Sequence, residues 1–317
     1  MLDSSRTAFL FPGQGSQEVS MGQALAQEFA AAQKIYTEAD ESLGFKISQL
    51  SWEGPEDTLN DTVNTQPALL VHSIAALRVF QEIMPDFEAA FVAGHSMGEF
   101  SALVAADALS FQDALTLVRR RGELMKAAGE TSPGGMAAIL GLEISTLDDI
   151  CSQASTAGQT ADQVVQVAND NCPGQVVISG AKPALERAMA AASEAGARKV
   201  VPLAVSIAAH SPLMTHAQED FNQAVAAAPI AAPKIPVIGN VSAKPLTTPE
   251  EIRVDLQAQL TERVRWTETI QFLLDQGIDT FIDVGSGNVL TGLVKRVNRK
   301  TTRLSLGTPE DFTKIMG

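Results

Sequence analysis

The chain has 317 residues, of which 45% are hydrophobic and 19% are charged. This composition is typical of a globular protein of about two domains, not of a disordered chain. Its 23 basic and 37 acidic residues give a net charge of -14, which argues against a nucleic-acid-binding protein because phosphate contacts need a basic footprint. No apolar run is long enough for a membrane span and the first residues do not form a signal peptide, so we expect a cytoplasmic protein without a membrane partner.

The N-terminal part alternates short apolar runs with longer helical patterns, as in a parallel sheet covered by helices. We place Pro67 in the first turn of its helix, where proline is tolerated. The elements expected up to residue 132 are a strand over 8–11, a helix over 67–84, a strand over 89–93, a helix over 99–107 and an apolar helix around 114–125.

The pattern changes near residue 133. From there to residue 202 the order strand, helix, strand, strand, helix, strand predicts a ferredoxin-like module. Its expected elements are 136–140, 146–154, 164–168, 175–178, 183–195 and 198–203.

After this module the first pattern resumes, so we expect it to be a subdomain of residues 133–202 inserted into a domain formed by residues 1–132 and 203–317. The elements expected in the last part are a helix over 212–227, a strand over 235–238, helices within 250–276, a strand over 280–282 and a last helix from about 289.

Gly94-His95-Ser96-Met97-Gly98 matches the G-x-S-x-G nucleophile elbow, and it lies between an expected strand and an expected helix, as that motif requires. The glycines allow a tight turn that lifts the serine hydroxyl clear of the sheet. We therefore interpret Ser96 as a nucleophile; the alternative is a serine that caps the helix.

A serine nucleophile needs a base, and the chain has four histidines. His72 lies in a helical pattern and is expected to be packed, while His216 is expected at the surface of a helix. His95 precedes Ser96, so in an elbow its side chain should point away from the hydroxyl. His210 comes in a loop before a helix, which suits either a base in a cleft or a capping role.

Two further segments have open interpretations. The loop Gly13-Gln14-Gly15 resembles a dinucleotide fingerprint, but Glu18 replaces the third glycine and would repel a pyrophosphate, so we exclude NAD. This loop either donates backbone N–H groups to an oxyanion or is a plain turn. Arg121 lies in an apolar helix; its spacing alone favours a buried salt bridge over a ligand contact.

Taken together, these motifs resemble the malonyl-CoA:acyl-carrier-protein transacylase family. The matching segments follow the family's order across nearly the whole chain: 11–17, 65–69, 94–99, 121–125, 171–177, 210–214 and 283–290. The resemblance implies an α/β fold in which an α/β-hydrolase-like large domain with a parallel sheet carries the ferredoxin-like subdomain. It also implies malonyl-CoA and acyl carrier protein as partners, no cofactor and no metal, and a monomer in fatty-acid synthesis.

The resemblance also implies residue roles. Ser96 would attack the thioester of malonyl-CoA while His210 takes its proton, and a backbone carbonyl of Gln259 would orient His210. The backbone N–H groups of Gln14 and Met97 would bind the oxyanion. The residues that would bind substrate are Arg121, which would pair with the malonyl carboxylate, Gln66 and Asn171.

The family contact at Gln259 comes from the main chain, so we expect side-chain changes there to be mild. Family members often have a bulky aromatic residue before the histidine; the smaller Ala209 puts selectivity against methylmalonyl groups in doubt. Ser286 stands where the family usually has proline.

A trans-acting polyketide-synthase acyltransferase would use the same residues. A serine thioesterase or esterase is disfavoured because its histidine usually lies close to the C-terminus. A non-catalytic carrier-binding protein would need neither Ser96 nor His210. A basic cluster is predicted to dock the carrier or CoA, or else to be a solvated face: Lys295, Arg296, Arg299, Lys300 and Arg303.

Overall fold

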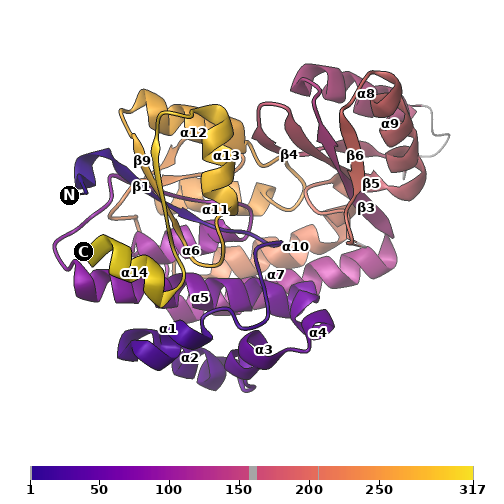
Figure 1. The fold of residues 1–317 in the computed structure, drawn as a ribbon. Coiled ribbons are helices and arrows are strands. Elements are labelled where there is room, and N and C mark those ends of the chain that lie inside the picture. The colour runs from indigo at the N-terminus through magenta and orange to yellow at the C-terminus, as the bar shows by residue number, and fades with distance from the viewer. Residues whose placement is uncertain (1, 157–162, 206, 317) are drawn as a thin grey trace.

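The computed structural model describes residues 2–156, 163–205 and 207–316, and in this part of the chain it contains two β-sheets (Figure 1). Residues 1, 157–162, 206 and 317, which the predicted domain division includes, lie outside the described residues. The larger sheet has the order β10-β9-β1-β2-β7-β8, in which all neighbours are parallel except β7 and β8. Its strands are β1 (Thr7–Phe11), β2 (Phe91–Gly94), β7 (Val237–Ile238), β8 (Pro245–Leu246), β9 (Thr280–Val284) and β10 (Thr302–Leu306).

Strand β1 is buried on both faces because its apolar side chains point alternately to two helical layers. Phe9 and Phe11 pack in the core formed with α5, α6, α7 and α10, whereas Ala8 and Leu10 pack with α12 and α13. These helices are α5 (Thr62–Ile83), α6 (Gly98–Ala105), α7 (Phe111–Thr131), α10 (Thr215–Ala227), α12 (Trp266–Asp275) and α13 (Val289–Val297).

The smaller sheet is antiparallel and has the order β4-β5-β3-β6. One face is covered by α8 (Ile144–Thr156) and α9 (Lys182–Glu194). In Figure 1 this sheet lies at the right, and α7 extends toward it from beneath the larger sheet. The strands are β3 (Gly134–Leu140), β4 (Val165–Cys172), β5 (Gln175–Ala181) and β6 (Lys199–Pro202).

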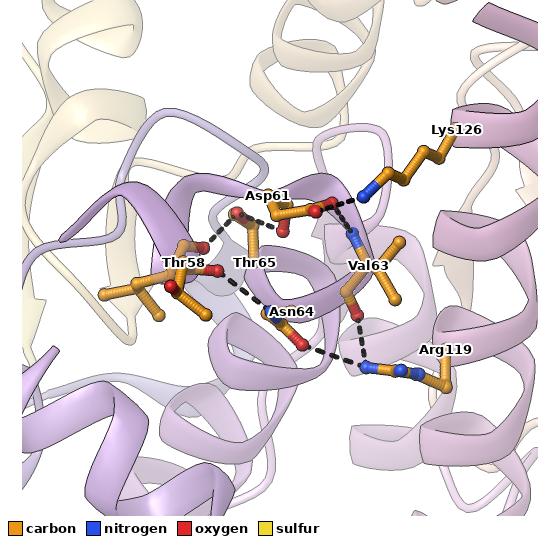
Figure 2. Close-up of polar contacts among 8 residues, drawn as sticks. Thr58, Asp61, Val63, Asn64, Thr65, Arg119 and Lys126 are labelled. Carbon is orange, nitrogen blue, oxygen red and sulfur yellow. Dashed lines mark hydrogen bonds and ion pairs between the residues drawn. The ribbon is translucent and has the colours of Figure 1, made fainter. Parts of the chain in front are cut away.

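Helix α5 begins before Pro67, so the prediction that Pro67 lies in a first turn is wrong. The Asp61 side chain caps the helix by accepting a hydrogen bond from the Val63 N–H, and Pro67 is then inside the helix. Proline has no N–H for the carbonyl four residues earlier. That carbonyl, on Val63, instead accepts a hydrogen bond of 3.1 Å from Arg119 Nη1 of α7 (Figure 2).

Figure 2 shows further contacts that fix the start of α5. Asn64 donates to the Thr58 carbonyl at 2.9 Å and accepts from Arg119 at 2.9 Å, while Lys126 of α7 pairs with Asp61. Gly122 makes this close approach of the two helices possible, because a Cβ atom there would lie 2.8 Å from the Thr62 carbonyl oxygen. The side chains of α5 and α7 that follow are therefore held in a fixed relation.

Several elements differ from those expected. Helices between residues 12 and 66 were not predicted: α1 (Gln23–Glu28), α2 (Ala30–Leu43), α3 (Ile47–Glu53) and α4 (Glu56–Asn60). The expected helix over 212–227 begins with the 3-10 turn Pro212–Met214, and the expected strand over 235–238 is two residues long. The helices expected within 250–276 are α11 (Pro249–Ala258) and α12. The helix expected from 289 is not the last element, because β10 and α14 (Pro309–Met316) follow it.

Candidate active site

Ser96 lies in the tight turn between β2 and α6, with a φ of 51°. The flanking glycines are needed because two backbones come close: a Cβ on Gly94 would lie 2.0 Å from the carbonyl carbon of Gly98, and one on Gly98 would lie 2.2 Å from the Phe11 carbonyl oxygen. Such contacts are possible only without side chains. The turn therefore presents the half-buried Ser96 hydroxyl at the carboxyl end of the parallel strands.

His210 forms a pair with Ser96. The Ser96 Oγ lies 2.8 Å from His210 Nε2, and His210 Nδ1 lies 2.8 Å from the Gln259 carbonyl oxygen. A carbonyl oxygen can only accept, so Nδ1 carries the proton and Nε2 is free to accept the Ser96 hydroxyl proton. Burial, the charge of Arg121 and His95 lower the pKa of His210 to about 3. The imidazole is thus neutral at neutral pH.

Arg121 is a buried cation beside this pair. Its Nη1 donates to Gln66 Oε1 at 2.8 Å, and its Nη2 donates to Gln259 Oε1 at 2.9 Å and to Ser96 Oγ at 3.1 Å. The side chain is 2% exposed, and burial lowers its pKa only to about 10, so it stays charged.

No carboxylate of the described residues forms an ion pair with Arg121, so the salt bridge favoured by its spacing is wrong. Its neighbours, Arg119 and Arg120, do have ion-pair partners, Glu123 and Asp220. An unpaired buried charge is costly. The guanidinium is thus suited to receive an anionic group of a ligand next to the Ser96 hydroxyl.

The Gln259 side chain does more than the sequence indicated. Besides accepting from Arg121, it donates to Glu99 Oε2 at 3.0 Å and to the Ser96 carbonyl at 3.3 Å, and it is fully buried. The expectation that side-chain changes at Gln259 are mild is therefore revised: its loss would remove one hydrogen-bond partner from the buried Arg121 and one from the buried Glu99.

Asn240 and Glu99 were not predicted as site residues. Asn240 Oδ1 accepts from the Ser96 N–H at 2.7 Å, its Nδ2 donates to the Gly94 carbonyl at 2.7 Å, and it also bonds Glu99. Burial, followed by the nearby Asp255 charge, raises the pKa of Glu99 well above its ordinary value. Glu99 belongs to the segment 94–99 that resembles the family. No sequence signal around Asn240 indicates that Asn240 supports the elbow.

The two expected oxyanion donors lie in different surroundings. Gln14 lines the cavity beside Ser96, and its side chain accepts from Thr62 Oγ1 at 2.9 Å. The Met97 side chain is buried beneath the elbow. Neither the Gln14 N–H nor the Met97 N–H donates to another residue of the described chain, so both N–H groups are free for a ligand.

The site opens into a cavity of about 960 Å³ between the two sheets. Asn171 of β4 lines it, and Asn171 Oδ1 lies 2.8 Å from Nε2 of His95, whose ring also packs edge-on against Trp266. The cavity thus brings Asn171 of the smaller sheet together with loop, turn and helix residues around the larger sheet: Gln14, His95, Ser96, Arg121 and His210. Gln66 is not a lining residue of the cavity; it accepts a hydrogen bond from Arg121, which is one.

The remaining histidines lie outside this cavity, whereas the basic cluster borders it, because Arg296 Nη1 donates at 2.7 Å to Oε1 of the cavity-lining Gln175. His72 is buried and lines a separate cavity, while His216 is exposed. Lys295 and Arg296 are on α13, whereas Arg303 is half-buried on β10. Its Nη1 donates to Thr301 Oγ1 at 2.7 Å. Docking by this cluster stays a prediction.

Comparison with known proteins decides the family. Residues 8–307 of the chain match the sequence model of a protein family described as the acyl transferase domain. A malonyl CoA-acyl carrier protein transacylase of Bacillus subtilis is 46% identical over 96% of this chain and 95% of its own length. The chain belongs to the malonyl-CoA:acyl-carrier-protein transacylase family of acyl transferases. Another transacylase of this name, from Staphylococcus aureus, is 43% identical over 97% of both chains.

Two solved structures resemble this transacylase-family member over nearly its whole length. An acyl carrier protein S-malonyltransferase from Vibrio cholerae superposes with a TM-score of 0.93 at 40% identity, covering 98% of this chain and 99% of its own. A malonyl-transacylase solved in complex with a type II polyketide acyl-carrier protein gives 0.94 at 39% identity, with the same coverage. The predicted resemblance to this acyltransferase family is confirmed. In the described part of the chain, no helix has the length and apolar character for crossing a membrane.

Proposed function

We propose that the protein transfers a malonyl group from malonyl-CoA to the pantetheine thiol of acyl carrier protein in fatty-acid synthesis. The observation that carries this proposal is the buried Arg121 guanidinium, which has no carboxylate partner among the described residues and lies 3.1 Å from Ser96 Oγ. In a malonyl thioester a single methylene separates the carboxylate from the reacting carbonyl. A cation 3.1 Å from Ser96 Oγ is therefore well placed to pair with the carboxylate of a malonyl group whose carbonyl is attacked by Ser96.

In the first half-reaction Ser96 Oγ attacks the thioester carbonyl while His210 Nε2 takes its proton. The 2.8 Å contact between these atoms and the Nδ1 contact to the Gln259 carbonyl support this assignment. The oxyanion accepts from the N–H groups of Gln14 and Met97. When the tetrahedral intermediate collapses, the carbon–sulfur bond breaks, His210 returns the proton to the CoA sulfur, and malonyl-Ser96 remains.

The second half-reaction reverses these roles on a different thiol. His210 takes the proton of the pantetheine thiol, the sulfur attacks the ester carbonyl of malonyl-Ser96, and the proton passes back to Ser96 Oγ as the carbon–oxygen bond breaks. Arg121 pairs bidentately with the malonyl carboxylate in both halves. Gln66, which bonds Arg121, and Asn171, which lines the cavity, complete the acyl pocket.

We further infer that the two sheets are separate structural units with the predicted boundaries. The order β4-β5-β3-β6 is that of a ferredoxin-like module and supports a subdomain of residues 133–202. The mostly parallel larger sheet and its elbow support an α/β-hydrolase-like domain of residues 1–132 and 203–317.

We also propose a cytoplasmic monomer that needs no cofactor. Ala209 lines the cavity, and its tolerance of an α-methyl group stays a prediction.

Incubation with malonyl-CoA and no acceptor is expected to give one malonyl adduct, on Ser96. Adding the pantetheine form of acyl carrier protein should discharge the adduct much faster than water does, because a transferase holds its ester for the thiol. Intact-mass spectrometry over time measures both steps. Ser96→Ala is the control that should show no adduct; adduct on that variant would contradict the nucleophile, and equally fast loss to water would indicate a hydrolase.

The pH profile of acylation is expected to be flat from about pH 8 down to about pH 5. The base must be neutral, and His210, whose pKa is about 3, stays neutral across this range. A histidine with the ordinary pKa of about 6.5 would instead lose activity about tenfold per pH unit below that value. The measurement is kcat/KM for malonyl-CoA against pH, which reports groups of the free enzyme; a break near pH 6.5 would contradict a buried neutral base.

A further inference from the structure

Strand β4 of the smaller sheet is joined to the turn that orients His210. The Val264 N–H donates to the Ala168 carbonyl at 2.8 Å, and the Asp170 N–H donates to the Val264 carbonyl at 2.9 Å. Residues just before this short bridge supply the carbonyl of Gln259 that holds His210 Nδ1. An isolated bridge at Val264 thus joins the segment that follows the orienting turn to the edge strand β4 of the smaller sheet.

Gln166, on the same strand, ties the histidine to that turn. Its Nε2 donates to the His210 carbonyl at 2.9 Å and to the Thr261 carbonyl at 2.8 Å, so both amide hydrogens are used. No other group of the described chain donates to either carbonyl. One side chain therefore links the main chain of His210 to the segment whose Gln259 and Glu262 carbonyls lie 2.8 Å and 3.2 Å from its ring Nδ1.

This link matters because the His210 backbone is held in a strained conformation. Its φ is 56°, in the left-handed region that residues other than glycine rarely adopt. Such a conformation persists only where the surroundings fix it. The Gln166 contact acts on the main chain of the strained residue itself, whereas the Gln259 contact acts on its ring.

The geometry points to Gln166 as a positioning residue that sets the orientation and the Nδ1–H tautomer of His210 from the smaller sheet. This inference rests on the proposed function, in which His210 is the base. Gln166 contacts neither Arg121 nor Ser96, so it acts on the proton-transfer step and not on the binding of the malonyl carboxylate.

Gln166→Met and Gln166→Glu test the inference. The first removes both donors with little change in size, and the second directs carboxylate oxygens at two carbonyl oxygens. A displacement of about 1 Å in such a group costs about 100-fold in rate, so we expect malonyl-Ser96 formation at saturating malonyl-CoA to slow about 10- to 100-fold. The malonyl-CoA concentration that gives half the maximal rate should be unchanged.

Gln163→Glu is the matched control, because it adds the same negative charge three residues before Gln166. The Gln163 side chain accepts a hydrogen bond from Arg187. Ser96 of this variant should be malonylated as fast as in the unchanged protein. Nitrogen-15 NMR of the four histidine rings supplies a readout that does not depend on malonyl-CoA. The unchanged protein should give an Nδ1–H signal for His210, and Gln166→Met a mixture of tautomers.

A wild-type acylation rate in both Gln166 variants would overturn the inference, as would slow acylation with the His210 tautomer unchanged. If the unchanged protein is not malonylated at all, the proposed function fails. The NMR comparison still decides whether Gln166 holds the imidazole.

Discussion

Arg121→Ala is expected to lower kcat/KM for malonyl-CoA by about 100- to 1000-fold, which corresponds to about 3–4 kcal/mol of lost charge pairing in a buried site. Activity on acetyl-CoA, which has no carboxylate, should fall far less, so the ratio of the two substrates shifts toward acetyl. The reason is that Arg121 is charged, 2% exposed and, among the residues that the structure describes, bonded only to the neutral groups of Gln66, Gln259 and Ser96. Steady-state rates with both thioesters measure the shift.

Arg120→Ala is the control for this experiment. Arg120 is the adjacent residue of the same helix, but it is exposed and pairs with Asp220 at 3.2 Å. Exposed ion pairs contribute little, so both substrates should be used as before. Equal losses on malonyl-CoA and acetyl-CoA in Arg121→Ala would remove Arg121 from carboxylate recognition and leave it a structural role.

The arginine run illustrates what spacing alone can predict. Three consecutive residues of a helix point in three directions, so at most one or two of Arg119, Arg120 and Arg121 can share its buried face. Spacing could not indicate the partner: no carboxylate of the described residues pairs with Arg121, and the amides of Gln66 and Gln259 lie around the guanidinium instead. The resemblance to a family indicated the ligand contact; periodicity did not.

The buried central elements were predictable and the edges were not. Strands β1, β2 and β9 are apolar runs that lie between helical layers, so hydrophobicity marks them. Strand β10 has one buried residue, Leu306, in the sequence Thr-Arg-Leu-Ser-Leu, because it is the last strand of the sheet. Half-exposed edge strands carry little hydrophobic signal.

The supporting residues of the site could not be predicted for a different reason. Asn240 reaches Ser96 across 144 positions, and Gln166 reaches His210 across 44 positions. Amide side chains occur at many surface positions, and their function here comes only from which main-chain groups the fold brings next to them. Motifs identify the nucleophile and its base, whereas the groups that hold them become visible only in three dimensions.

His210→Ala is expected to slow acylation of Ser96 about 10⁴-fold, the upper end of what a positioned general base contributes. Malonyl-CoA binding should change little, because Arg121 keeps its contacts to Gln66 and Gln259. Single-turnover acylation across a range of malonyl-CoA concentrations separates the two quantities, and His216→Ala, an exposed histidine at the start of α10, is the control.

The comparison with Arg121→Ala makes this second test decisive. The arginine variant should lose discrimination between malonyl and acetyl groups, whereas the histidine variant should lose rate on both by the same factor, because the Ser96 proton must be removed whichever acyl group arrives. Acylation of His210→Ala at more than about a tenth of the unchanged rate would contradict His210 as the base. The base would then have to be sought among the other groups near Ser96, of which His95 lies in the same cavity with its Nε2 bonded to Asn171.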